Sequence, residues 1–150
     1  MSASPGIDIV NLQRRHRVNR ILLRKVLTRA MRECGLNGTL SVAVVGPDAI
    51  AALNRRFLSR DGLTDVLSFP VKDARSGILG EIAICADAAS AEASRRGVSF
   101  DSELALYAVH GLLHLAGYDD GTPGERARMR ARERGIMDLF ELRKRRGPGA

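Results

Sequence analysis

Residues 39–57 of the chain are TLSVAVVGPDAIAALNRRF, and the pattern of apolar residues changes at Gly46. Thr39–Val45 is β-branched and apolar, which is typical of a buried strand. After a Gly-Pro-Asp turn, apolar residues recur at helical spacing as far as Phe57, which predicts a short helix with one apolar face. This stretch therefore predicts a fold in which strands and helices alternate along the chain.

Apolar patterns typical of strands and of helices continue toward both ends of the chain. Three more strands are predicted at Gly6–Leu12, Thr64–Phe69 and Leu79–Cys85, and Pro70 ends the second of these or marks a sheet edge. Four more helices are predicted: Val18 to Gly35, Asp87–Arg96, Ser99 to Gly117, and a last helix that opens at the capping sequence Thr122-Pro123-Gly124-Glu125. Four strands and five helices in this order predict a compact α+β domain.

The length of 150 residues suits one domain. We expect it to span residues 1–150, with 143–150 as a basic, disordered tail. With 45% hydrophobic and 27% charged residues, the composition is that of a soluble globular protein. No apolar run approaches the roughly 18 residues of a membrane span, and the N-terminus turns basic where a signal sequence would be apolar. We therefore expect a cytoplasmic protein.

The two cysteines, Cys34 and Cys85, lie far apart and outside any CxxC spacing. Neither belongs to a local motif, so both are predicted to be reduced, buried thiols rather than catalytic groups.

The net charge of +7 is concentrated in the two terminal segments. Residues 1–35 hold eight basic and two acidic side chains and residues 123–150 hold nine and four, so the ends carry +11 and the middle carries −4. Basic surface attracts a polyanion such as RNA. The alternative is a solvated helix face followed by a basic tail, because a run of charge specifies no partner.

The segment with the clearest chemistry is HGLLHLAGYDD, residues 110–120. Its histidines, His110 and His114, are four residues apart, which places both imidazoles on one face of a helix at a distance suited to a single metal ion. Gly117 can end that helix in the left-handed conformation, so that Asp120 approaches the same ion. Two imidazoles and one carboxylate leave a fourth tetrahedral position open, which is typical of a catalytic zinc site.

Other interpretations of these residues stay open. A helical HxxxH pair also occurs as satisfied core histidines, and either aspartate can be a turn residue. Asp120 is favoured over Asp119 as a ligand on spacing. The third histidine, His16, lies in a basic stretch and is predicted to be a surface residue.

These blocks together resemble the YbeY family of bacterial rRNA maturation factors, which are metal-dependent single-strand endoribonucleases. The family's HGxLHLxGYDH block corresponds to residues 110–120. An upstream block corresponds to LNRRFLSRDGLTDVLSFP, residues 53–70, and GEIAI at 80–84 resembles the strand between them. The likeness covers roughly residues 40–140.

This resemblance implies a mixed four-stranded sheet packed with helices, one zinc ion and a cytoplasmic location. It further implies work on the 3′ end of 16S rRNA in the small ribosomal subunit and in ribosome quality control. It leaves open whether a small-subunit ribosomal protein or an assembly GTPase recruits the protein.

Two positions depart from the family pattern. Asp120 replaces the usual third histidine ligand, which keeps a zinc ligand but adds negative charge and should make a bound water less acidic. Leu58 stands where many members have an arginine that faces RNA phosphate. Arg60, two residues later, is our candidate for an equivalent phosphate contact.

The motif leaves the proton acceptor of the reaction open. The metal would act as a Lewis acid or activate a water. The base would be a carboxylate such as Asp65 or Asp119, or the RNA itself would take part through attack by its 2′-hydroxyl. In HExxH metallopeptidases a glutamate follows the first histidine, whereas this chain has Gly111, which argues against a peptidase. The rival from another class is a non-catalytic, zinc-containing rRNA-binding assembly factor.

Overall fold

The computed structural model describes residues 6–58, 65–71 and 77–140. Within these ranges, strands and helices follow one another in the predicted order. The strands are β1 (Gly6–Asn11), β2 (Thr39–Val45), β3 (Val66–Pro70) and β4 (Ile78–Cys85). The helices are α1 (Arg20–Glu33), α2 (Pro47–Leu58), α3 (Ala86–Arg96), α4 (Phe100–Leu115) and α5 (Pro123–Asp138). The tail predicted at 143–150 lies outside the described residues.

The strands form one sheet in the order β1-β2-β4-β3. β1, β2 and β4 are parallel, whereas β3 pairs antiparallel with β4 at one edge. The prediction of an α+β fold with a mixed four-stranded sheet is thus confirmed. Pro70 lies opposite Gly80 at the end of the edge strand, where a residue without an N–H group is tolerated.

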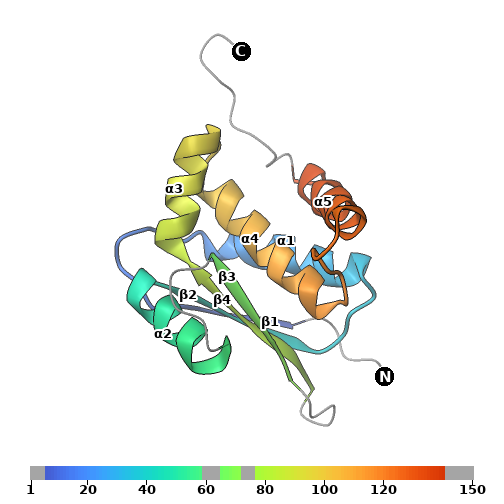
Figure 1. Cartoon of the computed structure of the whole chain (residues 1–150), viewed down its shortest axis with the longest axis horizontal. Coiled ribbons are helices and arrows are strands. Elements are labelled where there is room, and N and C mark those ends of the chain that lie inside the picture. Colours follow the sequence, from blue (N-terminus) through green and yellow to red (C-terminus); the bar gives the residue numbers. More distant parts are fainter. Residues whose placement is uncertain (1–5, 59–64, 72–76, 141–150) are drawn as a thin grey trace.

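Helices cover the two faces of the sheet unequally (Figure 1). α1 and α4 pack on one face, with α3 and α5 against α4, while α2 packs on the other. Side chains of β2 point alternately to the two faces of the sheet. Val42 and Val44 belong to the large core under α1 and α4, and Val45 belongs to the smaller core under α2. No helix in the described ranges combines the length and the apolar character of a bilayer-crossing segment.

Side-chain caps set where α1, α4 and α5 begin. α1 begins at Arg20 rather than near Val18, because the Asn19 side chain accepts a hydrogen bond from the N–H of Leu22. The caps predicted at Ser99 and Thr122 are confirmed, since their hydroxyls accept from the N–H groups of Ser102 and Glu125.

The cysteine prediction is half right. Both cysteines are free thiols and Cys85 is buried, but Cys34 is only partly buried. It follows the last residue of α1 as the C-terminal cap, where the helix reaches the surface.

A buried ion pair joins α3 to α4. The side chain of Glu103 is 1% exposed, and both its oxygens accept from Nη1 of Arg96, at 2.5 and 2.9 Å. Burial raises the pKa of Glu103, while the neighbouring Arg96 guanidinium opposes that rise. The carboxylate therefore depends on this arginine to remain charged in the core.

Arg96→Met is expected to lower the free energy of unfolding by about 3 kcal/mol at pH 7, because it leaves a buried carboxylate without its partner. The pKa of Glu103 would then rise further, so protonation on acidification removes the charge and the deficit shrinks as pH falls. Urea unfolding at pH 7 and pH 5 measures both effects.

Arg95→Met is the matched control, since Arg95 pairs with Glu92 at the surface, and it should cost less than about 1 kcal/mol. Equal losses in the two variants would contradict a special role for the buried pair.

Candidate metal centre

His110 and His114 lie one turn apart in the C-terminal half of α4, as predicted. Their Nε2 atoms are 3.1 Å apart, and the rings meet edge to face with centroids 4.7 Å apart. Both imidazoles therefore direct a nitrogen to the same point beside the helix.

A tight turn brings the third residue to that point. Gly117 has φ +100°, and the N–H groups of Gly117 and Tyr118 donate to the carbonyls of His114 and Leu113, which is the Schellman arrangement of a helix end. The chain then doubles back, and Oδ2 of Asp120 lies 3.5 Å from Nε2 of His114 and 3.8 Å from Nε2 of His110. The predicted glycine turn is confirmed.

The three donor atoms are spaced as one metal ion requires. Donors about 2.05 Å from a tetrahedral zinc ion lie about 3.3 Å from one another. The triangle of His110, His114 and Asp120 has sides of 3.1, 3.5 and 3.8 Å, close to that value. Among the described residues, this is the only such group of histidine, cysteine and carboxylate side chains.

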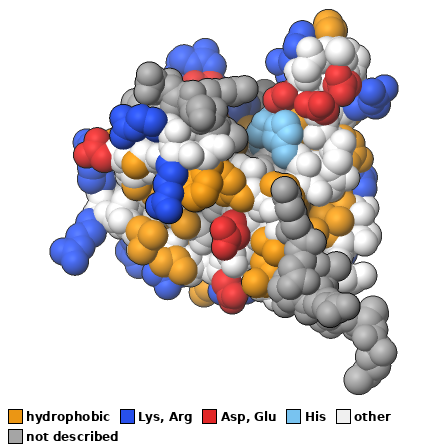
Figure 2. All heavy atoms as spheres, turned by 60° about the horizontal axis from the view of Figure 1, so that its bottom comes forward, with side chains coloured by type: hydrophobic (Ala, Val, Ile, Leu, Met, Phe, Trp, Pro, Cys, Tyr) orange, Lys and Arg blue, Asp and Glu red, His pale blue; other side chains and the backbone are white. Residues whose placement is uncertain are grey.

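The centre opens to the surface. The side chains of His110, His114 and Asp120 are 29%, 31% and 46% exposed, and Figure 2 shows histidine side chains at the surface directly beside acidic ones. Asp119 stabilises the turn instead: its Oδ1 accepts a hydrogen bond from the N–H of Asp120 at 2.8 Å.

Glu133 belongs to this site, and the sequence reasoning missed it. From α5, its Oε2 lies 2.6 Å from Nδ1 of His110, and its side chain is 13% exposed. A signal was present in the sequence: Glu133 occupies the same helical face as the buried residues Met129, Ile136 and Met137. A single carboxylate on an apolar stripe indicates a polar partner inside the fold.

Gly111 lets α4 approach the sheet closely. A Cβ atom at this position would lie 3.0 Å from Cγ2 of Ile82 and from Oγ of Ser68. The Ser68 hydroxyl also donates to the Gly111 carbonyl at 2.9 Å. A side chain at 111 would therefore point into the sheet, which supports the argument against a metallopeptidase glutamate there.

Comparison with known proteins identifies the family. A family profile described as Endoribonuclease YbeY matches residues 8–141. The chain belongs to this family. The YbeY relatives include a Geobacter metallireducens protein that is 39% identical over 90% of this chain and 95% of its own, and a Carboxydothermus hydrogenoformans protein that is 37% identical over 90% and 97%; both are named Endoribonuclease YbeY.

A solved structure supports the fold. The solution structure of TM1509 from Thermotoga maritima is similar with a TM-score of 0.63 and 25% identity, covering 96% of this chain and 99% of that one. The family profile and the named relatives confirm the resemblance to the YbeY family inferred from the sequence motifs.

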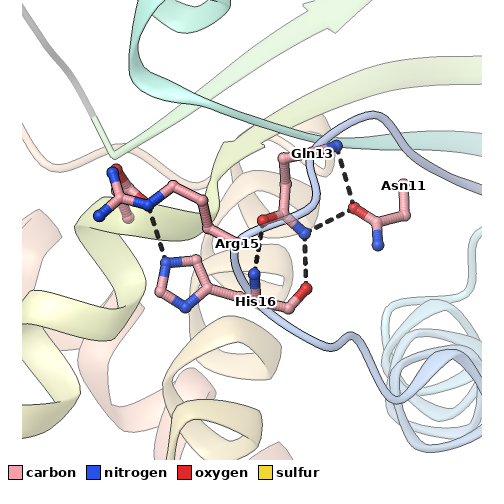
Figure 3. Close-up of polar contacts among 5 residues, drawn as sticks. Asn11, Gln13, Arg15 and His16 are labelled. Atoms are coloured by element: carbon pink, nitrogen blue, oxygen red, sulfur yellow. Dashed lines mark hydrogen bonds and ion pairs between the residues drawn. The ribbon is translucent and has the colours of Figure 1, made fainter.

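His16, predicted to be a surface residue, is only partly exposed, with 22% of its side chain accessible. Its ring stacks on Phe100 and places Nε2 2.7 Å from Oδ1 of Asp87, whose other oxygen, Oδ2, accepts from Arg15. Figure 3 shows how Gln13 links Asn11 to the backbone of His16. This network fastens the loop after β1 to the start of α3, and it lies at the opposite end of α4 from His110 and His114.

Two of the positions compared with the YbeY pattern lie outside the described residues. Arg60, our candidate for phosphate contact, is one, and the side chain of Leu58 is the other. The replacement of histidine by Asp120 is visible, and its carboxylate reaches the place where a third ligand is needed.

Gly111→Ala is expected to lower the free energy of unfolding by about 1 kcal/mol, because crowding against Ile82 outweighs the better helix propensity of alanine. It should also weaken metal binding, since α4 carries both histidines. Gly135→Ala in α5 is the control, because a Cβ there meets nothing within 4 Å. Chemical denaturation measures the free energy of unfolding of both variants. If Gly111→Ala stabilised the protein as much as Gly135→Ala does, α4 would be able to move away from the sheet.

Proposed function

We propose that this protein is a zinc-dependent endoribonuclease that cleaves single-stranded rRNA, with one ion held by His110, His114 and Asp120. The observation that carries the proposal is the triangle of donor atoms in a chain of the Endoribonuclease YbeY family. Two imidazoles and one carboxylate suit zinc better than magnesium or calcium, which prefer oxygen ligands. When bound, the ion supplies Lewis-acid chemistry to a phosphodiester.

The surroundings of the centre suit a polymeric substrate. All three donor side chains are partly exposed, so a chain of nucleotides can reach them without entering a closed pocket. Arg126 lies beside the turn and donates through Nη1 to the Asp120 carbonyl at 3.2 Å. It holds the turn and adds positive charge where a phosphate would approach.

The helices at the two basic ends meet in the fold. α1 and α5 contact each other, and Arg132 of α5 donates to the carbonyl of Glu33 in α1. Some arginines of α1 and α5 have structural partners: Arg29, for example, forms an ion pair with Glu33. Exposed ones on α5, including Arg128, Arg130 and Arg134, lie on the helix that carries Glu133 and provide the charge for RNA phosphates.

The candidate bases differ in their surroundings. Asp119 is exposed while it braces the turn. Asp65 accepts a hydrogen bond from the Tyr107 hydroxyl, whose pKa is raised by burial and by the Asp65 charge, so that hydroxyl stays protonated. Neither arrangement excludes attack by the RNA 2′-hydroxyl, which would leave a cyclic phosphate, whereas attack by water would leave a linear one.

We place this activity in the cytoplasm, in maturation of the 3′ end of 16S rRNA and in ribosome quality control. The support is the family membership, together with relatives named Endoribonuclease YbeY. The strongly basic ends of the chain fit an rRNA partner.

Cleavage of a single-stranded RNA that carries the 16S 3′ end tests the proposal. Native and zinc-restored protein should cut it, whereas chelated protein and His114→Ala should be slower by on the order of 100-fold or more, because transition-state charge loses its stabilisation. Gel analysis of the products, including their end groups, measures rate and chemistry together.

If no sample cuts the RNA although zinc is bound, the enzymatic proposal fails. The non-catalytic rRNA-binding assembly factor would then be favoured. Cleavage that survives both chelation and His114→Ala would point to a contaminating nuclease.

The affinity for RNA should fall steeply with salt. If about four arginines contact phosphates of a single strand, raising monovalent salt fourfold should increase the Kd roughly 50-fold. Fluorescence anisotropy with a labelled oligonucleotide measures this dependence. A Kd that is independent of salt would mean that contacts other than phosphate charges dominate.

A further inference from the structure

The contact between Glu133 and His110 determines which imidazole nitrogen is available to a metal. Oε2 of Glu133 lies 2.6 Å from Nδ1 of His110, and an ionised carboxylate can only accept, so this contact places the hydrogen on Nδ1 of His110. In the neutral ring, the lone pair is then on Nε2. This is the atom that lies 3.1 Å from Nε2 of His114 and 3.8 Å from Oδ2 of Asp120.

Glu133 is held by a packed helix rather than by a loop. α5 is capped by Thr122, and buries Met129, Ile136 and Met137. Arg132, the preceding residue, ties the helix to α1 through the Glu33 carbonyl. Because the carboxylate is mostly shielded from water, its hydrogen bond is stronger and better oriented than a surface contact would be.

The charge of Glu133 also favours a cation in the site. Together with Asp120 it places one carboxylate near each ring nitrogen of His110. Two negative charges match a divalent ion, and hydrogen bonding from Nδ1 to a carboxylate makes Nε2 a better donor.

We propose that Glu133 is a positioning residue that holds His110 in the tautomer with hydrogen on Nδ1, and thereby increases the affinity of the centre for its metal ion. The inference rests on the metal site of the proposed function, but not on RNA cleavage. Glu133 acts through His110 and does not itself contact the ion.

Zinc affinity of the full-length, metal-stripped protein tests this, measured by competition with a chromophoric chelator. Glu133→Ala should raise the Kd for zinc by about 10- to 100-fold. Glu133→Gln should raise it less, because an amide oxygen can still accept from Nδ1 but carries no charge. Glu125→Gln makes the same charge change in the first turn of α5 and is the control. It should leave the Kd within about twofold, since a carboxylate outside the ligand set acts through its hydrogen bond to a metal ligand.

A second measurement separates orientation from folding. The ¹⁵N chemical shifts of the metal-free wild type should show the His110 hydrogen on Nδ1, and Glu133→Ala should shift the ring toward a mixture of tautomers. Thermal unfolding of each variant checks that the fold is retained.

The proposal is overturned if folded Glu133→Ala binds zinc as the wild type does, or if wild-type His110 carries its hydrogen on Nε2. Both measurements are made without RNA. A protein that binds zinc through Glu133-dependent His110 but cuts no RNA would therefore refute the endoribonuclease proposal alone.

Discussion

The close approach of α4 to β3 and β4 at Gly111 is the contact on which the rest of the site depends. Without a side chain at this position, the helix backbone lies against Ile82 and accepts a hydrogen bond from Ser68. The same helix then carries His110 and His114 away from the sheet, toward the turn that follows. A larger residue would move the helix and both imidazoles together, because packed interiors do not deform locally at low cost.

From that fixed helix, the centre is assembled by a short stretch of chain. The turn at Gly117 reverses the direction of the chain and brings Asp120 close to the two histidines. α5 then packs beside α4 and places Glu133 against Nδ1 of His110. Helix, turn and helix thus supply every described side chain of the site. The sheet contributes position rather than chemistry, which is how a scaffold holds donor atoms in place for a metal.

Charge is organised by the same packing. α1 and α5, which lie within the two basic terminal segments of the sequence, contact each other. Acidic groups are placed differently: Glu103 is buried against Arg96, and Asp87 binds Arg15 and His16. Beside the acidic candidate metal centre (Figure 2), Arg126 of α5 donates to the Asp120 carbonyl and supplies positive charge that can attract a polyanion.

The sequence by itself determined what depends on neighbours along the chain. The periods of 2 and 3.6 residues predicted the strands and helices within one or two residues, and the spacing of His110, His114 and Asp120 predicted the donor cluster, because a helical turn and a glycine turn are local geometry. Only the tertiary structure decided the partners of His110 and His16. Glu133 lies 23 residues from the first and Asp87 lies 71 residues from the second, and such pairs form only when packing brings separate elements together.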